Sequence, residues 1–137
     1  MISNVLLDTG PLVAYLHRRD RNHLWAVQQL SKITPPLLTC EAVLAEACFL
    51  LRGFKGGGWP VLELLESGLV RVAFHLEDEI SAVRKLVARY QSVPMALADA
   101  CLVRMSELRS QSSVLTCDSD FGIYRKHGRM RIPLIIP

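Results

Sequence analysis

The sequence predicts a three-layer α/β/α sandwich around a mostly parallel central sheet. Short apolar runs, such as residues 4–7 and 114–116, alternate along the chain with longer amphipathic segments, such as residues 76–90. Strands that are separated by helical segments favour a parallel sheet with helices on both faces. With 137 residues, 50% of them hydrophobic and 21% charged, the chain fits one compact domain, which we expect to span residues 1–137.

Each expected element has a local reason. The strands are short apolar runs, and we place them at residues 4–7, 37–39, 69–74, 114–116 and 132–136. The last of these is expected at the edge of the sheet because of Pro133 and Pro137. The helices have apolar residues at helical spacing, and we place them at residues 11–17, 22–32, 41–52, 59–67, 76–90 and 95–109, with a helical turn at 118–124.

Particular residues mark where these helices begin and end. Pro11 suits the first turn of a helix, where its missing N–H costs least. Asn22 and Thr39 are suited to cap the helices that follow them. Residues 53–58 include three consecutive glycines and are expected to form a flexible connection, and Gly68 is expected to end the next helix.

Composition narrows the function classes. The formal net charge of +3, from 16 Lys and Arg against 13 Asp and Glu, is well short of a polybasic nucleic-acid binder. No apolar run reaches the ~20 residues of a membrane-spanning helix, and the first apolar stretch lacks the features of a signal peptide, so we expect a cytoplasmic protein without membrane contact. The four cysteines form no CxxC pair, which argues against zinc and favours buried, reduced thiols.

Acidic residues follow two of the expected strands. Asp8 comes directly after the run that ends at Leu7, and Asp118, with Asp120 close behind, follows the run that ends at Thr116. Ligands of parallel sheets bind outside the carboxyl ends of the strands. If both strands are central and parallel, these carboxylates emerge at the same edge of the sheet.

Two further acids, Glu46 and Asp99, lie within expected helices and have apolar neighbours one turn away. We expect Glu46 to point towards apolar packing, withdrawn from the polar face of its helix. No basic residue lies one turn from either acid, so local ion pairs do not balance their charge. A hard divalent cation would balance the charge of these acids, and ligation by oxygen atoms alone favours Mg²⁺ or Mn²⁺ over Zn²⁺. Such a metal activates water and binds phosphate oxygens, which makes phosphodiester hydrolysis the natural reaction.

Four segments together resemble the PIN-domain ribonucleases, and most closely the short VapC-type toxins. These segments are LLDTGPLVAYL at 6–16, residues 39–51 around Glu46, Ala98-Asp99-Ala100, and VLTCDSDF at 114–121. The resemblance implies a flavodoxin-like α/β/α sandwich and a Mg²⁺-dependent endoribonuclease. It also implies a homodimer and a VapB-type antitoxin, a segment of which blocks the site.

The resemblance also assigns roles to particular acids. Asp8 and Asp99 become the principal metal ligands, and Glu46 completes the acidic pocket. Asp118 is preferred as the fourth acid because it lies nearer the strand end, and Asp120 is the other position of the family pattern.

Two threonines adjoin these acids. The hydroxyls of Thr9 and Thr116 are suited to hydrogen-bond the carboxylates or a metal-bound water. In the expected mechanism, Mg²⁺ activates a water that attacks a backbone phosphate in line, with a second ion near Asp118 when RNA is bound. Glu46 holds or deprotonates that water.

Three alternatives stay open at this stage. A catalytically inactive PIN-like protein that binds RNA or a partner is the first. The sequence Leu-Leu-Asp-Thr-Gly at 6–10 also matches the triplet of retroviral-type aspartic proteases, but those proteins have an all-β fold. A phospho-accepting receiver domain has an acidic pocket too, but it needs a Lys at the end of a late strand, whereas Lys126 follows an expected helical turn.

Two basic clusters follow the proposed site strands and are candidates for binding RNA phosphates. They are His17, Arg18, Arg19, Arg21 and His23, and Arg125, Lys126, His127, Arg129 and Arg131. The glycine run with Phe54, Lys55 and Trp59 is a candidate substrate flap, although it lacks the ending of a nucleotide-binding loop. Solvated surface loops are the alternative interpretation in each case.

Overall fold

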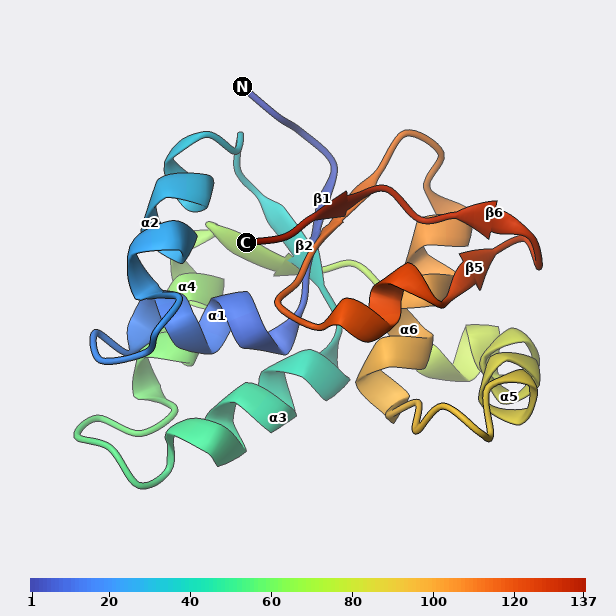
Figure 1. Ribbon diagram of the computed structural model, residues 1–137. Helices are drawn as coiled ribbons and strands as arrows, with labels where there is room; N and C mark the ends of the chain where they lie inside the picture. Colours follow the sequence, from blue (N-terminus) through green and yellow to red (C-terminus); the bar gives the residue numbers. More distant parts are fainter.

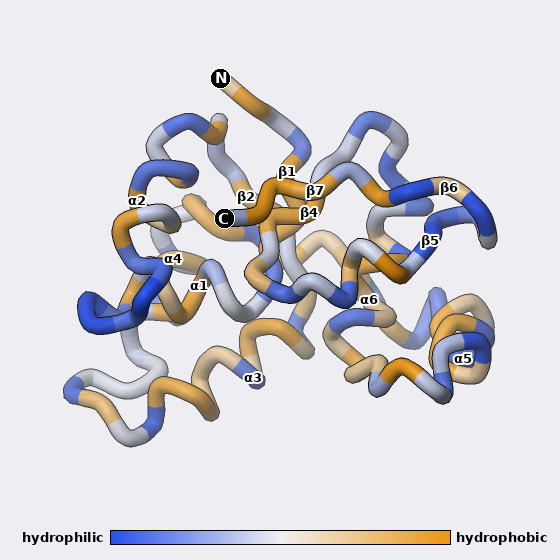
Figure 2. The backbone as a smooth tube through the Cα atoms, in the orientation of Figure 1, coloured by the Kyte–Doolittle hydropathy of each residue, from blue (hydrophilic) through white to orange (hydrophobic).

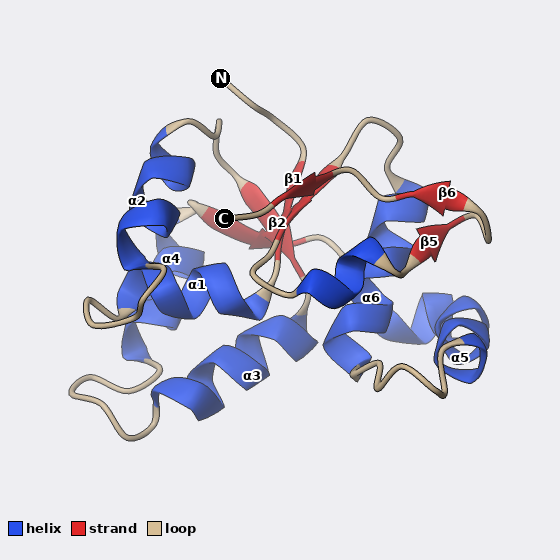
Figure 3. Cartoon of the chain, viewed as in Figure 1, coloured by secondary structure: helices blue, strands red, loops and turns tan.

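Five parallel strands form the central sheet of the computed structural model, which describes residues 1–137 (Figures 1 and 3). Their order is β3-β2-β1-β4-β7. Their bounds are β1 Val5–Leu7, β2 Leu37–Thr39, β3 Val70–Val72, β4 Ser113–Leu115 and β7 Leu134–Ile135. In the middle of the sheet, Leu6 of β1 pairs with Leu38 of β2 and with Val114 of β4. The predicted α/β/α class with a parallel sheet is confirmed.

Helices cover both faces of this sheet. They are α1 Thr9–Leu16, α2 His23–Ser31, α3 Glu41–Leu51, α4 Trp59–Ser67, α5 Ile80–Arg89 and α6 Leu97–Leu108, with short 3₁₀ helices η1 Leu76–Glu79 and η2 Ser119–Gly122. Figure 1 shows α1, α2 and α4 on one side of the sheet, and α5 and α6 on the other. Because α3 packs against both α1 and α6, it closes the space beside the edge where β1 and β2 end.

The core is centred on β1. Its three residues, Val5, Leu6 and Leu7, are at most 1% exposed, because helices cover a central parallel strand on both faces. Figure 2 shows the apolar strands in the interior and hydrophilic loops at the periphery. The sequence prediction therefore placed this strand well, since an uninterrupted apolar run is what a doubly covered strand requires.

A short antiparallel hairpin was absent from the sequence prediction. It consists of β5 Arg125–Lys126 and β6 Met130–Arg131, joined by residues 127–129, of which His127 and Gly128 have positive φ. Each strand has only two residues and carries basic side chains, so neither shows an apolar alternation. The expected helix at 76–90 is also divided, because its first, acidic turn is the 3₁₀ helix η1 and α5 begins at Ile80.

Asn22 and Thr39 do not cap helices through their side chains, which corrects the prediction. Asn22 precedes α2 without a capping bond, and its backbone N–H donates to Asp20 Oδ1 at 2.8 Å. The Thr39 hydroxyl donates instead to the carbonyl oxygen of Leu7 at 2.9 Å, and so joins the end of β2 to the end of β1. The hydroxyl therefore serves the contact between two neighbouring strands and does not serve the helix that follows.

The cysteines are all unpaired, and Cys40 and Cys101 are buried as expected. Cys48 and Cys117 are only half-buried, which differs from the expectation; Cys48 faces Gly58 of the glycine-rich loop, and Cys117 lines the cavity described below. Among the helices, none combines the length and the apolar character that crossing a membrane requires.

Candidate metal centre

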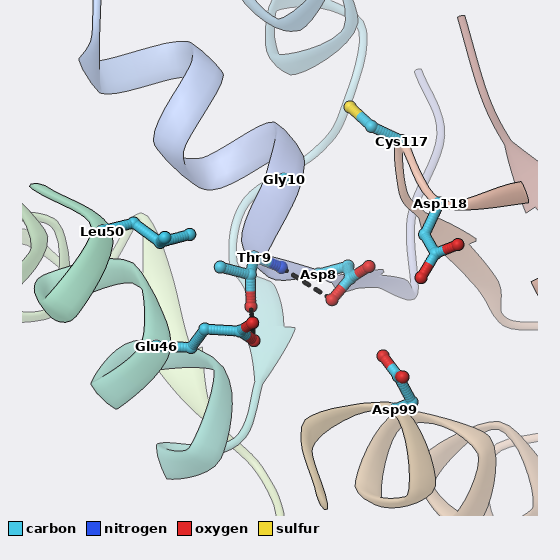
Figure 4. Close-up of a pocket in the computed structure, with 8 residues that line it drawn as sticks. All are labelled: Asp8, Thr9, Gly10, Glu46, Leu50, Asp99, Cys117 and Asp118. Carbon is cyan, nitrogen blue, oxygen red and sulfur yellow. Dashed lines mark hydrogen bonds between the residues drawn. The ribbon is translucent and has the colours of Figure 1, made fainter. Parts of the chain in front are cut away.

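The carboxyl ends of β1 and β4 lie side by side and open into one cavity. Leu7 pairs with Leu115, so the residues that follow the two strands emerge together. The cavity has a volume of about 280 Å³. Figure 4 shows its lining, which consists of Asp8, Thr9, Gly10, Glu46, Leu50, Asp99, Cys117 and Asp118. Four acids from four separate segments of the chain therefore meet in one place.

Asp8 is the buried member of this group, with 5% of its surface exposed. Its Oδ1 accepts the N–H of Thr9 at 2.7 Å, as the N-cap of α1, and its Oδ2 accepts the hydroxyl of Thr116 at 2.7 Å. Burial raises the pKa of Asp8 to about 6, and repulsion from Asp99 and Asp118 acts in the same direction. The carboxylate is therefore held rigidly in a place where its charge is unfavourable.

Thr116 connects the two strand-end acids. Its hydroxyl oxygen donates to Asp8 and accepts the backbone N–H of Asp118 at 2.9 Å. The Asp118 side chain is fixed in turn, because its Oδ1 accepts the N–H of Asp120 at 2.9 Å. Asp118 lines the cavity, whereas Asp120 contributes only this backbone contact and lies outside the lining.

Asp99 enters the cavity from the first turn of α6, and Figure 4 shows its carboxylate directed towards Asp8 and Asp118. Its Oδ2 accepts the N–H of Ala96 at 3.0 Å and faces the Tyr124 hydroxyl at 3.4 Å. Burial raises the pKa of Asp99, and the charges of Asp118 and Glu46 add to that effect. Asp99 therefore caps the N-terminus of α6 and lines the cavity at the same time.

Glu46 reaches the cavity from α3, but its surroundings differ from the prediction. The side chain is exposed and does not face apolar packing. We inferred burial from the apolar residues one turn away, but two of them, Phe49 and Leu50, are themselves 58% and 45% exposed. Glu46 Oε2 accepts the hydroxyl of Thr9 at 2.9 Å, which anchors the side chain at the cavity rim. Of the four cavity acids only Asp8 is buried.

Two residues of this site were missed from the sequence. Tyr124 contacts Asp99 although 25 residues separate them, and no local pattern signals that approach. Gly10 lies against the segment after β4, since a Cβ on it would come within 3.2 Å of Cys117 Cβ. A small residue is therefore needed where α1 passes this loop.

No basic side chain balances the cavity acids. The ion pairs of the protein join Arg104 to Glu79 and Glu107, and His75 to Asp78, all outside the cavity. The Cys117 thiol lines the cavity, but burial raises its pKa to about 11, and it is therefore protonated at neutral pH. The available ligands are consequently carboxylate oxygens.

The side chains also limit which cation fits. No three of them lie close enough together to form a closed ligand cluster. A tetrahedral zinc cage is therefore a poor match. Mg²⁺ retains several waters and binds proteins through one or two carboxylates, which matches separated carboxylates around an open cavity. The residues present therefore fit a hydrated hard cation.

The fold and the cavity together define an α/β domain with an acidic ligand pocket at the carboxyl edge of its parallel sheet. Comparison with known families makes this class specific. The PIN domain family matches residues 5–126, and the chain belongs to that family. Over 134 residues the chain is also 25% identical to Ribonuclease VapC26 of Mycobacterium tuberculosis, a similarity that covers 96% of this chain and 99% of that protein.

Proposed function

We propose that this protein is a metal-dependent endoribonuclease that hydrolyses phosphodiester bonds in RNA, and that it is the toxin of a toxin–antitoxin pair. The observation that carries the proposal is the cavity at the ends of β1 and β4, where Asp8, Asp99 and Asp118 converge without a counter-charge. Membership of the PIN domain family and the similarity to a ribonuclease support the choice of RNA as substrate.

In this proposal Asp8 and Asp99 would hold Mg²⁺, for which Mn²⁺ is a suitable substitute, and Asp118 would bind a second ion when RNA is present. When bound, the cation supplies a water of lowered pKa and positive charge beside the phosphate oxygens. Thr9 and Thr116 keep the acids in place through the hydrogen bonds described above.

Glu46 is the candidate for handling the proton of the attacking water. Its Oε2 is engaged by Thr9, and its Oε1 makes no hydrogen bond within the protein. Because the side chain is exposed at the cavity rim, that oxygen is accessible to water and to substrate. Thr9 therefore orients one oxygen of Glu46 and leaves the other available as a base.

A homodimer and a VapB-type antitoxin are part of the same proposal. Large apolar side chains are 45–68% exposed along α3 and α4, namely Phe49, Leu50, Trp59 and Leu62. Exposed apolar side chains that gather on two helices packed against each other are typical of protein–protein contacts. Leu50 also lines the acidic cavity, so a partner that covers this surface would obstruct it. Light scattering of the purified protein measures the first partnership. Co-purification with the product of a neighbouring small reading frame measures the second.

The test of the enzymatic activity compares cleavage of RNA by the unmodified protein and by Asp99→Asn. We expect cleavage with Mg²⁺, its loss in EDTA, and its recovery when excess Mg²⁺ is added. Asp99→Asn should lose more than the roughly 10- to 100-fold that removal of an outer partner of a metal ligand costs. Glu63→Gln, which neutralises an exposed acid of α4, is the matched control and should cleave normally.

Two results would count against the proposal. Cleavage that persists in EDTA would show that the activity does not depend on a metal ion. Full activity of Asp99→Asn would show that the acidic cavity is not the active site. An unmodified protein that binds RNA and leaves it intact with Mg²⁺ or Mn²⁺ would favour the alternative, a PIN-like protein that only binds RNA or a partner. Circular dichroism of each variant establishes that it is folded.

A further inference from the structure

A second cavity lies at the outer ends of α1 and α3, away from the acidic one. Its volume is about 450 Å³, and its lining consists of His17, Arg18, Arg19, Phe54 and Lys55. Two loops that are distant in sequence form it, the loop after α1 and the glycine-rich loop after α3. Figure 1 shows these loops together at the side of the molecule opposite the β5–β6 hairpin.

Two aromatic rings meet in this cavity. The ring centroids of His17 and Phe54 are 4.1 Å apart, with an angle of 37° between the ring planes. Phe54 is 49% exposed, so much of its ring remains available. Backbone hydrogen bonds from Phe54 N–H to Leu51 and from Gly57 N–H to Phe54 hold the loop in place. An exposed, fixed aromatic ring is a platform on which a nucleobase stacks, whatever its identity.

Three cationic side chains surround the rings without acidic partners. Arg18, Arg19 and Lys55 form no ion pair. The nearest acid in sequence, Asp20, uses its Oδ1 to accept the N–H of Asn22. By contrast, the guanidinium of Arg52 lies over the Phe49 ring and donates to the Phe49 carbonyl, away from this cavity. The three free cations beside an aromatic surface suit a phosphate backbone with its bases turned inward.

The distance between the two cavities is short enough for a single RNA strand to occupy both. α1 begins directly after Asp8, in the acidic cavity, and ends directly before His17, in the basic one. At ~1.5 Å per residue, the eight residues of α1 span about 12 Å. A few nucleotides of a single strand cover that distance, so an RNA chain bound at the acidic cavity is long enough to reach this second one.

We propose that the cavity between the α1 and α3 loops is a nucleotide subsite for single-stranded RNA. The base of a nucleotide a few positions from the cleaved bond stacks on Phe54 beside His17, and Arg18, Arg19 and Lys55 bind the adjoining phosphates. The position of this subsite relative to the cleaved bond rests on the proposed function, whereas its binding of single-stranded RNA does not. Because stacking accepts any base, the subsite contributes affinity and a requirement for strand length, and contributes no sequence preference.

The test is a binding titration that involves no cleavage. A fluorescent single-stranded RNA of mixed sequence is titrated in EDTA at low ionic strength with the unmodified protein, Phe54→Leu and Lys55→Ala. Phe54→Leu keeps an apolar side chain and removes the ring, and we expect its Kd to rise about tenfold with an unchanged salt dependence. Lys55→Ala should also bind more weakly, with a salt slope reduced by about 1.

Matched controls separate the subsite from general surface effects. Leu108→Ala shortens an exposed apolar side chain at the end of α6, and Lys85→Ala removes a charge on α5, and both residues lie outside the cavity. Both should bind RNA like the unmodified protein. An RNA series with one abasic position moved along the strand should contain a position that weakens binding to the unmodified protein. The same position should have no effect on binding to Phe54→Leu.

The subsite is overturned if Phe54→Leu and Lys55→Ala bind like their controls, or if the unmodified protein binds no single-stranded RNA. It is also overturned if the abasic series affects the unmodified protein and Phe54→Leu equally. Binding as expected, together with no cleavage in Mg²⁺ or Mn²⁺, would instead reject the proposed nuclease function and retain the subsite.

Discussion

Asp8 is held where its charge destabilises the folded protein, so neutralising it should stabilise the metal-free fold at neutral pH. The substitution is Asp8→Asn, which keeps the size of the side chain and one carbonyl oxygen. That oxygen still accepts the N–H of Thr9. The amide group replaces the oxygen that accepts the Thr116 hydroxyl, so one buried hydrogen bond has to rearrange.

The expected magnitude follows from the pKa of Asp8, which the fold raises from 3.8 to about 6. Because each tenfold change in a protonation equilibrium is worth about 1.4 kcal/mol, the ionised carboxylate costs the folded state about 3 kcal/mol at pH 7. Asp8→Asn removes this cost, but the weakened hydrogen bond with Thr116 destabilises the variant by about 1 kcal/mol. We therefore expect a net stabilisation of about 2 kcal/mol, or roughly 8 °C in Tm.

The sign of the pH dependence gives a sharper test. The folded protein keeps the proton of Asp8 up to about pH 6, whereas the unfolded chain releases it near pH 3.8. Between these values unfolding releases a proton, so a rise in pH lowers the contribution of Asp8 to stability. Asp8→Asn should therefore be about 1 kcal/mol less stable than the unmodified protein near pH 4. Near pH 7 it should be the more stable of the two.

The assay is urea denaturation in EDTA across this pH range, with the two proteins compared at each pH. Excess Mg²⁺ should stabilise the unmodified protein at pH 7 and leave Asp8→Asn nearly unchanged, since a ligand that binds only the folded state stabilises it by mass action. A stability difference that stays constant from pH 4 to pH 7 would refute the reasoning. So would a variant that is destabilised throughout.

Three further predictions concern the same cavity. Thr116→Val should lower stability by about 1–3 kcal/mol in urea denaturation, because it leaves the Asp118 N–H unpaired. It should also move the acidic limb of the pH–rate profile to higher pH, because the Thr116 hydrogen bond lowers the pKa of Asp8. Asp118→Asn should reduce kcat/KM in RNA cleavage far more than Asp120→Asn, since only Asp118 lines the cavity, and equal losses would contradict this assignment. The affinity for Mg²⁺, measured by calorimetry, should fall about tenfold for each pH step below 6, because a proton on Asp8 competes with the metal.

The elements that follow from local chemistry were predictable. The helix at 59–67 and the strand at 37–39 have the predicted bounds, since Gly68 ends the helix with a positive φ and the strand is a short run of buried residues. The β5–β6 hairpin was not predictable, because two-residue strands carry no period. The side-chain partners of Asn22 and Thr39 were mispredicted for a different reason. Local sequence identifies a donor or acceptor, but tertiary structure decides which partner lies nearest.

The same distinction applies to the cavity. The position of Asp8 and Asp118 together was predictable from one topological rule, because both follow strands that proved adjacent and parallel. The exposure of Glu46 was not, since apolar neighbours on a helix imply burial only if another element covers them. The contact between Tyr124 and Asp99 depends on how the segment after β4 crosses α6.

Because β1 pairs with β4, residues that lie far apart in the order of translation together form the acidic cavity. Asp8 leaves the ribosome early, yet the groups that bury and hold it, the Leu115 carbonyl and the Thr116 hydroxyl, are translated more than a hundred residues later. Until then β1 lacks one of its two neighbours, and the carboxylate has neither its fixed geometry nor its raised pKa. The acidic cavity therefore forms only after residues 115 and 116 have been synthesised and β4 has packed beside β1.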